Sequence, residues 1–482
     1  MRLLLVSITG MRGFYINCIT VEDISNDSTC FLGVDIPGVS SANDLGREFI
    51  TGFMQNTNST RGEDSLKLII TTFSGPTFVS IKITNSQVQW TVYLQQGQTQ
   101  VVSVPQSSEM IGSARFPSSI LINSDNDISV VSVNEKPLSV GSAALLPVPQ
   151  LGTKYYVVTP TGKQKCSYKE FAVINYGFRN KIIINFKCRV MFTGEVFSPN
   201  KKLTITLEPY QALQLQSEDD MSGTMLISEK PIAVLSGHSC VGQDNMCDHA
   251  YEQLPPLSNW GKVFLVPPLK AKPNSDFAYV VAARWNTYVT YISGQAKYRK
   301  KLGSGEVFVI EVKPSTPISI SASAVIQVLY YHTGDMTQPL EHGSFIISLK
   351  DTSTFCTSYS VYGLVNFDNS AAIVAKTSAT SEITLDNQPL SNIHWTQILG
   401  SQYSWGLTTL GNTLTSHIVE HPNTAFALLS FGNAYQRAYG TSTICTQGMC
   451  GKRSRKIQGV HMFEEVMEGE NRNVSFTDPL AV

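Results

Sequence analysis

One segment of the sequence concentrates the residue types that could do chemistry. Between Gly237 and Leu269 it holds two cysteines, two histidines and several carboxylates, followed by a Pro-Pro break and a Trp-Gly pair. Such side chains suit three arrangements: a metal cluster, a catalytic cysteine–histidine pair, or a loop closed by a disulfide bond. The choice among them separates an enzyme from a binding protein. The residues are His238, Cys240, Cys247, Asp248, His249, Glu252, Trp260 and Gly261.

A metal site is the less favoured interpretation of this segment. His238, Cys240, Cys247 and His249 are all ligand types that zinc accepts. However, the spacing of the two cysteines and their flanking histidines matches no common structural zinc motif. A Cys240–Cys247 disulfide closes a short polar loop, and we favour it over a metal site or free thiols. The sequence therefore predicts no metal ion and no cofactor.

Catalysis is also disfavoured. Cys247 and His249 would share one face of a strand, but nothing else marks an oxyanion hole or a nucleophile turn. The sequence holds no G-x-S-x-G, H-E-x-x-H, P-loop or G-x-G-x-x-G motif. Asp248 and Glu252 have the residue type of a glycosidase pair, yet sequence alone gives no geometry. We expect them to be structural, accepting backbone or Trp260 indole N–H groups, because buried carboxylates must be hydrogen-bonded. Together with His238, His249, Trp260 and Gly261 they would form a junction between the second and third of the repeated modules described below. Trp260 should lie buried beside the Cys240–Cys247 loop.

Composition narrows the class of protein. The chain has 482 residues, a formal net charge of −1 and only 15% charged residues, so no strong field directs it to nucleic acid. Hydrophobic residues make up 42%, which suffices for packed cores. The abundant valine, isoleucine, threonine, tyrosine and phenylalanine are typical of strands. No apolar run reaches the ~18 residues that a membrane-spanning helix needs.

Two sequence markers recur with a shared period of about a hundred residues. Late in each unit, two apolar runs are separated by a polar turn, as between Ile227 and Ile232. Within the units, apolar and polar residues alternate, as at Leu66, Leu68 and Ile70, which indicates strands with one buried face. The other marker is a glycine followed three residues later by an aromatic residue. Its copies are Gly46–Phe49, Gly152–Tyr155, Gly261–Phe264 and the degraded Cys356–Tyr359.

These patterns predict an all-β chain of four tandem antiparallel β-sandwich-like modules. About seven short strands per hundred residues suit a sandwich or a small barrel. A β-propeller-like arrangement is the alternative, although the period exceeds the 40–50 residues of one blade. The predicted divisions are an N-terminal segment 1–45, modules 46–150, 151–258, 259–355 and 356–440, and a C-terminal tail 441–482.

Cysteine usage favours an oxidising compartment. The nine cysteines form no C-x-x-C pair, and most of them fall in local twos, which suits disulfides better than cytosolic thiols. After Cys240–Cys247, the second predicted bond is Cys166–Cys188, which flanks the strand pair around 171–186. The local twos are Cys18/Cys30, Cys166/Cys188, Cys240/Cys247 and Cys445/Cys450, with Cys356 left over.

Other features of the chain agree with secretion. The first eight residues resemble a short signal peptide with a weak apolar core. A basic cluster near the end, Lys452–Lys456, suits solvated charge or a protease site. Three glycosylation sequons occur, at Asn26, Asn58 and Asn473.

The central segment resembles a known family, the N-terminal domain of IgGFc-binding protein and its relatives. The resemblance covers about residues 46–440. It implies a secreted or cell-surface β protein of several modules that binds or scaffolds, with no catalytic residues to carry over. The matching stretches are Ser236–His238, Cys247–His249, Glu252–Pro256, Trp260–Gly261, Pro267–Leu269, Gly46–Met54, Leu385–Leu390 and Phe431–Gly440.

Two hypotheses about function follow. The favoured one is a secreted or cell-surface binding or adhesion protein, without an active site, whose partners are extracellular proteins or glycans. The alternative is a secreted lectin or carbohydrate-active enzyme on the same β scaffold. A pair of catalytic carboxylates in a deep aromatic cleft would favour the alternative.

Overall fold

The computed structural model describes most of the chain between Asp44 and Thr446, together with two short strands before it. The predicted sequons at Asn26, Asn58 and Asn473 and the cysteine Cys166 lie outside the described part. The described residues are 17–21, 29–33, 44–56, 65–162, 167–243, 246–269, 274–335, 343–413 and 416–446.

The chain divides into two compact bodies. The main body is Ile36–Gly448, and the other is formed by Met1–Asp35 with Met449–Val482. In the described part of the smaller body, β1 (Asn17–Val21) pairs with β2 (Thr29–Gly33) in antiparallel fashion.

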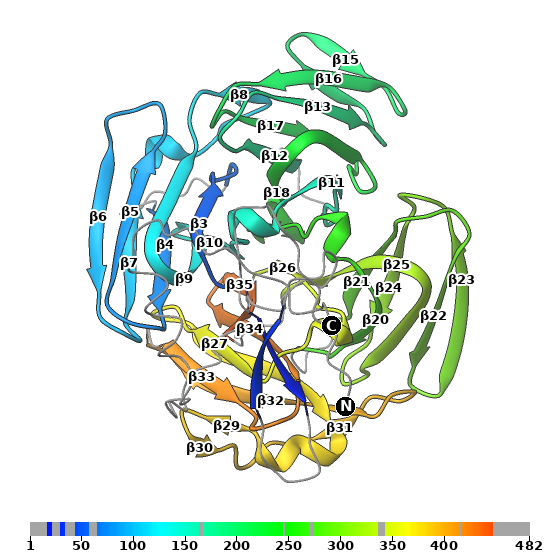
Figure 1. Cartoon of the computed structure of the whole chain (residues 1–482). Helices are drawn as coiled ribbons and strands as arrows, with labels where there is room; N and C mark the ends of the chain where they lie inside the picture. The colour runs from blue at the N-terminus through cyan, green and yellow to red at the C-terminus, as the bar shows by residue number, and fades with distance from the viewer. Residues whose placement is uncertain are drawn as a thin grey trace, which may run out of the picture. The chain divides into compact units, whose positions relative to one another are not determined.

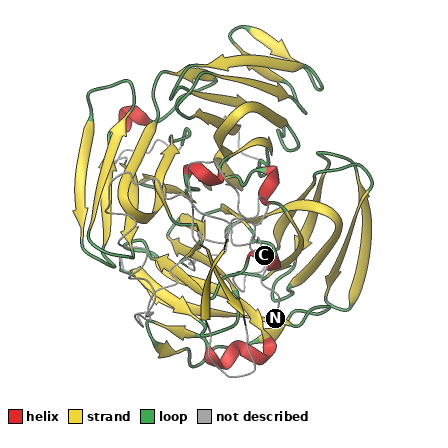
Figure 2. Cartoon of the chain, viewed as in Figure 1, coloured by secondary structure: helices red, strands yellow, loops and turns green. Residues whose placement is uncertain are grey.

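Most described residues of the main body belong to strands, which Figure 1 labels in chain order. Figure 2 shows that helix is confined to short 3-10 turns. In the described part of the chain, no helix is long and apolar enough to cross a membrane. The predicted all-β class is therefore confirmed. The turns are η1 (Gln106–Ser108), η2 (Val148–Gln150), η3 (Leu257–Asn259), η4 (Thr352–Thr354) and η5 (Thr377–Glu382).

The first three antiparallel sheets share one strand order. The orders are β6-β5-β9-β4-β7, β16-β13-β18-β12-β17 and β23-β22-β25-β21-β24. The first sheet contains β3 (Gly46–Thr51), β4 (Ser65–Thr72), β5 (Thr77–Ile83), β6 (Gln89–Leu94), β7 (Thr99–Val104), β9 (Ile120–Lys136) and β10 (Ser139–Ala144). The second contains β11 (Gly152–Tyr156), β12 (Lys169–Asn175), β13 (Asn180–Asn185), β16 (Lys202–Leu207), β17 (Ala212–Ser217), β18 (Met225–Gln243) and β19 (Met246–Gln253), with β8 (Ala114–Phe116) added at its edge. The third contains β20 (Gly261–Val266), β21 (Asp276–Ala282), β22 (Thr287–Ser293), β23 (Ala296–Leu302), β24 (Val307–Val312), β25 (Ile318–His332) and β26 (Phe345–Ser348).

The fourth group of strands has an equivalent pairing pattern, but two strands, β33 and β34, take the place of the single long strand β9, β18 or β25 of the other sheets. One half-sheet has the order β30-β29-β33-β27-β36 and the other β31-β32-β28-β34-β35. A separate hairpin joins β14 (Val190–Phe192) to β15 (Glu195–Phe197) beside the second sheet. The fourth group contains β27 (Ser358–Tyr362), β28 (Asp368–Lys376), β29 (Thr384–Leu385), β30 (Gln388–Pro389), β31 (Thr396–Gln397), β32 (Tyr403–Gly411), β33 (Ser416–Glu420), β34 (Ala427–Ala434), β35 (Arg437–Ser442) and β36 (Ile444–Cys445).

A long bent strand makes each sheet curl around its own core. In the first sheet, the start of β9 pairs with β3 and β5, whereas its later part pairs with β4 and β10. The two halves therefore face each other across one apolar cluster that includes Phe49, Leu68, Ile81 and Ile122. This sandwich-like curling follows from strands with one apolar face, which must be covered.

The polar turn predicted between Ile227 and Ile232 is not a turn. β18 runs through it without a break, and so do the equivalent strands β9 and β25. The pairing of β11 with β18 shifts register between Gly152 and Lys154, so the extra residues form a bulge that bends the long strand. Only the fourth group separates the two runs, as β33 and β34.

Four strands, β10, β19, β26 and β35, one from each group, meet in the middle of the main body, and we call them the central strands. In Figure 1 the labels of β10, β26 and β35 lie at the centre, with the sheets around them. Hydrogen bonds connect the four strands in a closed ring. They are Val140 N–H to Asp248, Ser348 N–H to Glu252, Ser442 Oγ to the Ser348 carbonyl, and Ser142 Oγ to the Gly440 carbonyl.

The repeated glycines hold equivalent positions. Each begins a strand and pairs with an isoleucine of the long strand next to a register shift: Gly46 with Ile128, Gly152 with Ile232, and Gly261 with Ile326. A Cβ at Gly46 or Gly152 would lie 2.3 or 2.4 Å from the Cβ of Pro147 or Pro256, and at Gly261 it would meet Asp351. Glycine is needed here because only it leaves room for the segment that follows the central strand. The aromatic partners Phe49, Tyr155, Phe264 and Tyr359 are all buried, as the pattern predicts.

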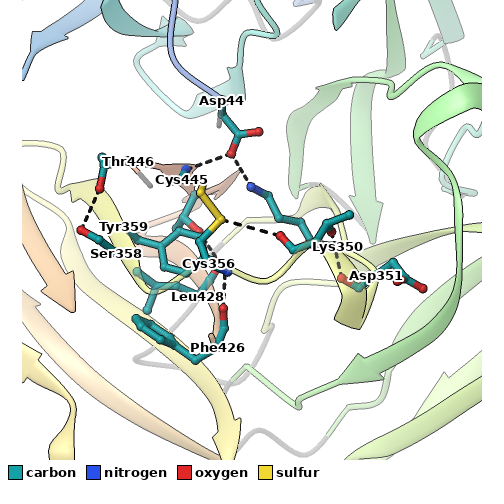
Figure 3. The surroundings of a disulfide bond; sticks show 12 residues. Asp44, Lys350, Asp351, Cys356, Ser358, Tyr359, Phe426, Leu428, Cys445 and Thr446 are labelled. Atoms are coloured by element: carbon teal, nitrogen blue, oxygen red, sulfur yellow. Dashed lines mark hydrogen bonds and ion pairs between the residues drawn. A yellow bond between two sulfur atoms is a disulfide. The ribbon is translucent and has the colours of Figure 1, made fainter. Parts of the chain in front are cut away.

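In the fourth group, a disulfide takes the place of this glycine contact. Cys356 bonds to Cys445, which follows the end of β35 as Pro147 follows β10 and Pro256 follows β19. Figure 3 shows the bond beside Tyr359, whose hydroxyl accepts from the Cys356 N–H and donates to the Phe426 carbonyl. The predicted local pair Cys445/Cys450 is therefore wrong, because folding brings the unassigned Cys356 to Cys445.

The shared order, bulge and glycine contact connect the sheets to the sequence repeat. The first three sheets each lie inside one predicted interval, except for β8, which pairs with the second sheet. The fourth group extends beyond residue 440, because β35 ends at Ser442 and β36 follows it. We infer that 46–150, 151–258, 259–355 and 356–440 are four structural repeats.

The glycine contact leads to a test. Gly152→Ala should lower the melting temperature, because the added Cβ overlaps Pro256, and overpacking of this kind typically costs about 1–3 kcal/mol. Gly75→Ala is the matched control, since no atom lies within 4 Å of the added Cβ there. Thermal melts of both variants measure the difference, and equal melting temperatures would contradict the close contact.

Candidate functional site

The hairpin of β18 and β19 positions the chemistry-bearing segment. The two strands pair from Leu235↔Gln253 to His238↔Ala250, and the register then shifts before Val241↔Asp248. Alternation along β19 places Asp248 and Glu252 on the same face. Both carboxylates are buried.

Asp248 joins the second sheet to the first and fourth. Its Oδ1 accepts the N–H of Val140 on β10 at 2.6 Å and that of His249 at 2.9 Å. Its Oδ2 accepts the N–H of Ala438 on β35 at 2.6 Å. Burial raises the pKa of Asp248 well above its ordinary value, and these backbone donors oppose the rise.

Glu252 joins the second sheet to the third and fourth. Its Oε2 accepts the N–H of Ser348 at 3.0 Å and the hydroxyl of Ser442 at 3.2 Å, while Oε1 accepts the N–H of Gln253. Burial raises the pKa of Glu252 to about 8 against these hydrogen bonds. The sequence predicted a junction between the second and third modules, whereas the two carboxylates contact all four sheets.

Trp260 is buried, as predicted, but its indole N–H does not donate to Asp248 or Glu252. Its Nε1–H donates to the carbonyl of Pro255 at 3.2 Å, and its ring packs on Tyr156 with centroids 5.6 Å apart. The indole lies beyond the end of β19 near Gln253, away from the turn that carries Cys247. The expected position beside the cysteine loop is therefore wrong, because η3 returns the chain to the opposite end of the hairpin.

The two histidines are neutral at physiological pH. His238 Nδ1 accepts the N–H of Cys240 at 3.1 Å, and His249 Nδ1 lies 3.2 Å from the carbonyl of His238. Burial lowers the pKa of each imidazole to about 3. His249 also stacks on Tyr251 with ring centroids 4.9 Å apart, so it packs between the central strands.

The state of the cysteines bears on the zinc and disulfide interpretations of this segment. Cys240 is disulfide-bonded, so it has no thiolate to offer to zinc. The side chain of Cys247 lies outside the described part, and the Cys240–Cys247 bond stays a prediction. Cys188 carries a free thiol inside the apolar core of the second sheet, so the predicted bond to Cys166 is not formed.

A cavity of about 360 Å³ lies where the four central strands end. The last residue of each strand lines it: Ala144, Gln253, Ser348 and Ser442. Trp260, Phe264 and Leu349 supply apolar walls, and Asp44 and Lys350 form an ion pair among the lining residues. Sequence reasoning missed this cavity, since its walls come from distant segments with no shared motif.

A second candidate surface lies on the third sheet, at its edge strand β23. Lys297, Arg299 and Lys301 alternate along the strand, so they project from one face, and all three are exposed. Arg299 lies over the ring of Tyr288 at 4.3 Å from its centroid, and Trp285 is 77% exposed beside Gly303. No carboxylate among the described residues forms an ion pair with these three cations. We call these five residues the β23 surface.

Comparison with known proteins decides the family. A family model described as IgGFc binding protein matches residues 141–432. The chain is also 34% identical over 400 residues to the IgGFc-binding protein of Homo sapiens, an alignment that covers 83% of this chain. This chain belongs to the IgGFc-binding protein family. It spans only 7% of the length of that human relative. The family is named for binding, which agrees with the resemblance found in the central segment.

The central carboxylates in this family member allow a stability test. Asp248→Asn keeps the shape of the side chain but turns an amide NH2 toward backbone N–H donors. Each donor left without an acceptor costs on the order of 1–3 kcal/mol, so the melting temperature should fall clearly. Asp368→Asn, at an exposed aspartate, is the control and should melt like the wild type. Unchanged melting of Asp248→Asn would refute the linking role.

Glu252 should also make stability depend on pH. Its pKa is about 8 in the folded chain against an ordinary 4.5, so the unfolded chain loses this proton first as pH rises. Stability should therefore fall between pH 4.5 and 8, by at most about 1.4 kcal/mol per pH unit from this group. The two histidines act in the opposite direction below pH 6.5, which makes pH 6.5–8 the informative window. Glu252→Gln should flatten the decline in melting temperature there, and parallel curves for both proteins would exclude this assignment.

Proposed function

We propose that this chain is a secreted or cell-surface binding protein without catalytic activity, whose ligands are extracellular proteins or glycans. Membership of a binding-protein family supports the binding role. The observation that carries the proposal is the β23 surface. An exposed indole next to three unpaired cations is suited to an anionic partner, although a chain with net charge −1 is not basic as a whole.

The carboxylates of the central cavity support the absence of catalysis. Glu252 accepts three hydrogen bonds from the protein, and Asp44 is engaged by Lys350 and by the N–H of Cys445. Asp351 accepts the N–H groups of Lys262 and Val263. A glycosidase needs one carboxylate as a proton donor and another facing water or sugar. Here all three face donors from the chain itself, which fits a structural role.

The charges on β23 have a second explanation that the experiment must separate. Lysines on an edge strand also prevent pairing with other chains. That explanation predicts aggregation when the charges are removed, with no loss of a specific ligand. The binding proposal predicts a soluble variant that no longer binds an anionic glycan.

The test is a protein and glycan array probed with the full chain. Sulfated glycans should be retained, and a variant with Lys297, Arg299 and Lys301 replaced by serine should bind them at least tenfold more weakly. The control is a triple variant in which three exposed lysines of the first and second sheets are replaced by serine, namely Lys82, Lys181 and Lys202. This control should bind the sulfated glycans as the wild type does. Affinity should also fall as salt increases, because charge attraction is screened. Equal binding by both triple variants would reject the β23 surface.

A further inference from the structure

The central cavity contains two buried amides whose hydrogen-bonding groups are not all used. Gln327 is 2% exposed, and neither its Oε1 nor its Nε2 has a partner in the described part of the protein. Gln253 is 3% exposed; its Oε1 accepts the N–H of Leu146, while its Nε2 has no acceptor. More than nine in ten buried polar groups in proteins are paired, and an unpaired one costs about 1–3 kcal/mol. Both glutamines are among the residues that line the cavity.

The fold does not require either glutamine. Gln327 follows Ile326, the partner of Gly261, and the matching residues of the first two sheets are Ser129 and Ala233. In the fourth group the matching residue is Ala427, which follows Phe426, the partner of Cys356. At the ends of the central strands, Gln253 stands where the other groups carry Ala144, Ser348 and Ser442. Alanine or serine occupies six of these eight matching positions, so the two glutamines are a local feature of the cavity.

We propose that the central cavity binds a neutral sugar residue. A primary amide offers one acceptor and one donor side by side, which matches two adjacent hydroxyls of a sugar at Gln327. The Nε2 of Gln253 supplies a further donor for a third oxygen. Trp260 and Phe264 give the apolar wall that the C–H face of a sugar ring needs, and the indole N–H is already used by Pro255.

Charge and size favour a neutral ligand of one or two rings. Lys350 neutralises Asp44, and Glu252 with its pKa of about 8 is mostly protonated at pH 7, so Asp351 is the negative charge that an acidic sugar would meet in the lining. A volume of about 360 Å³ lies at the low end of small-molecule sites. This site is separate from the β23 surface, and its occupant does not depend on whether that surface binds anionic glycans.

The substitutions that test this site introduce the residues found at the matching positions of the other repeats. Gln327→Ala places the residue found at the matching positions 233 and 427, and Gln253→Ser places the residue found at 348 and 442. Since Gln327→Ala removes two unpaired buried groups, the melting temperature of the unliganded variant should stay the same or rise. Gln253→Ser also removes the acceptor of the Leu146 N–H, so it serves the binding comparison alone. A purely structural glutamine would give the opposite result.

The experiment titrates the full chain with glucose, galactose, mannose and N-acetylglucosamine, and with sialic acid as the charged comparison, by calorimetry. At least one neutral sugar should bind saturably and more tightly than sialic acid. Gln327→Ala and Gln253→Ser should each weaken that binding at least tenfold, and Gln89→Ala, an exposed glutamine on β6, should leave it unchanged. The proposal is overturned if no neutral sugar binds, if both variants bind like the wild type, or if sialic acid binds best.

Discussion

The hydrogen bonds of two buried carboxylates on one strand are the constraint on which the main body depends. Asp248 and Glu252 stand four residues apart on β19, so they face the same way and reach the other three central strands. Each sheet can cover its own core by curling, but no single sheet can satisfy the polar backbone at the centre. A carboxylate accepts several N–H donors at once, which suits a point where strands of different sheets meet without forming a ladder.

In each of the four groups, the residue at or just before the first strand contacts the segment that follows the central strand. Three groups make this contact with a glycine, and the fourth makes it with a disulfide bond. A glycine lies against the residue that follows each central strand, at Pro147, Pro256 and Asp351, and in the fourth copy a disulfide joins Cys356 to Cys445. The bond ties the segment that precedes β27 to β36, the last strand of the fourth group. Asp44, near the start of the body, accepts the N–H of Cys445, so the two ends of the body are held at one place (Figure 3).

The same geometry bears on the proposed binding function. The segment richest in thiols, imidazoles and carboxylates supplies structural hydrogen bonds, neutral histidines and a disulfide-bonded cysteine. Among the residues that line the central cavity, the buried groups left unpaired are amides that no chemical motif would select, those of Gln253 and Gln327. Amides neither transfer protons nor attack substrates, yet they orient polar ligands well. A site built from them is suited to recognition.

The sequence by itself determined the all-β class, the period of about a hundred residues, the equivalent glycines and the family, because alternation, turn chemistry and recurring motifs are local signals. It also identified Asp248, Glu252 and Trp260 as buried junction residues. It could not show that Ile227–Ile232 bends without a turn, that Cys356 meets Cys445, or that Trp260 faces a cavity with Gln327. Those results depend on how the long strands curl and on which segments then meet. Contacts between residues far apart in the chain are set by the packing of whole sheets, and no local pattern records them.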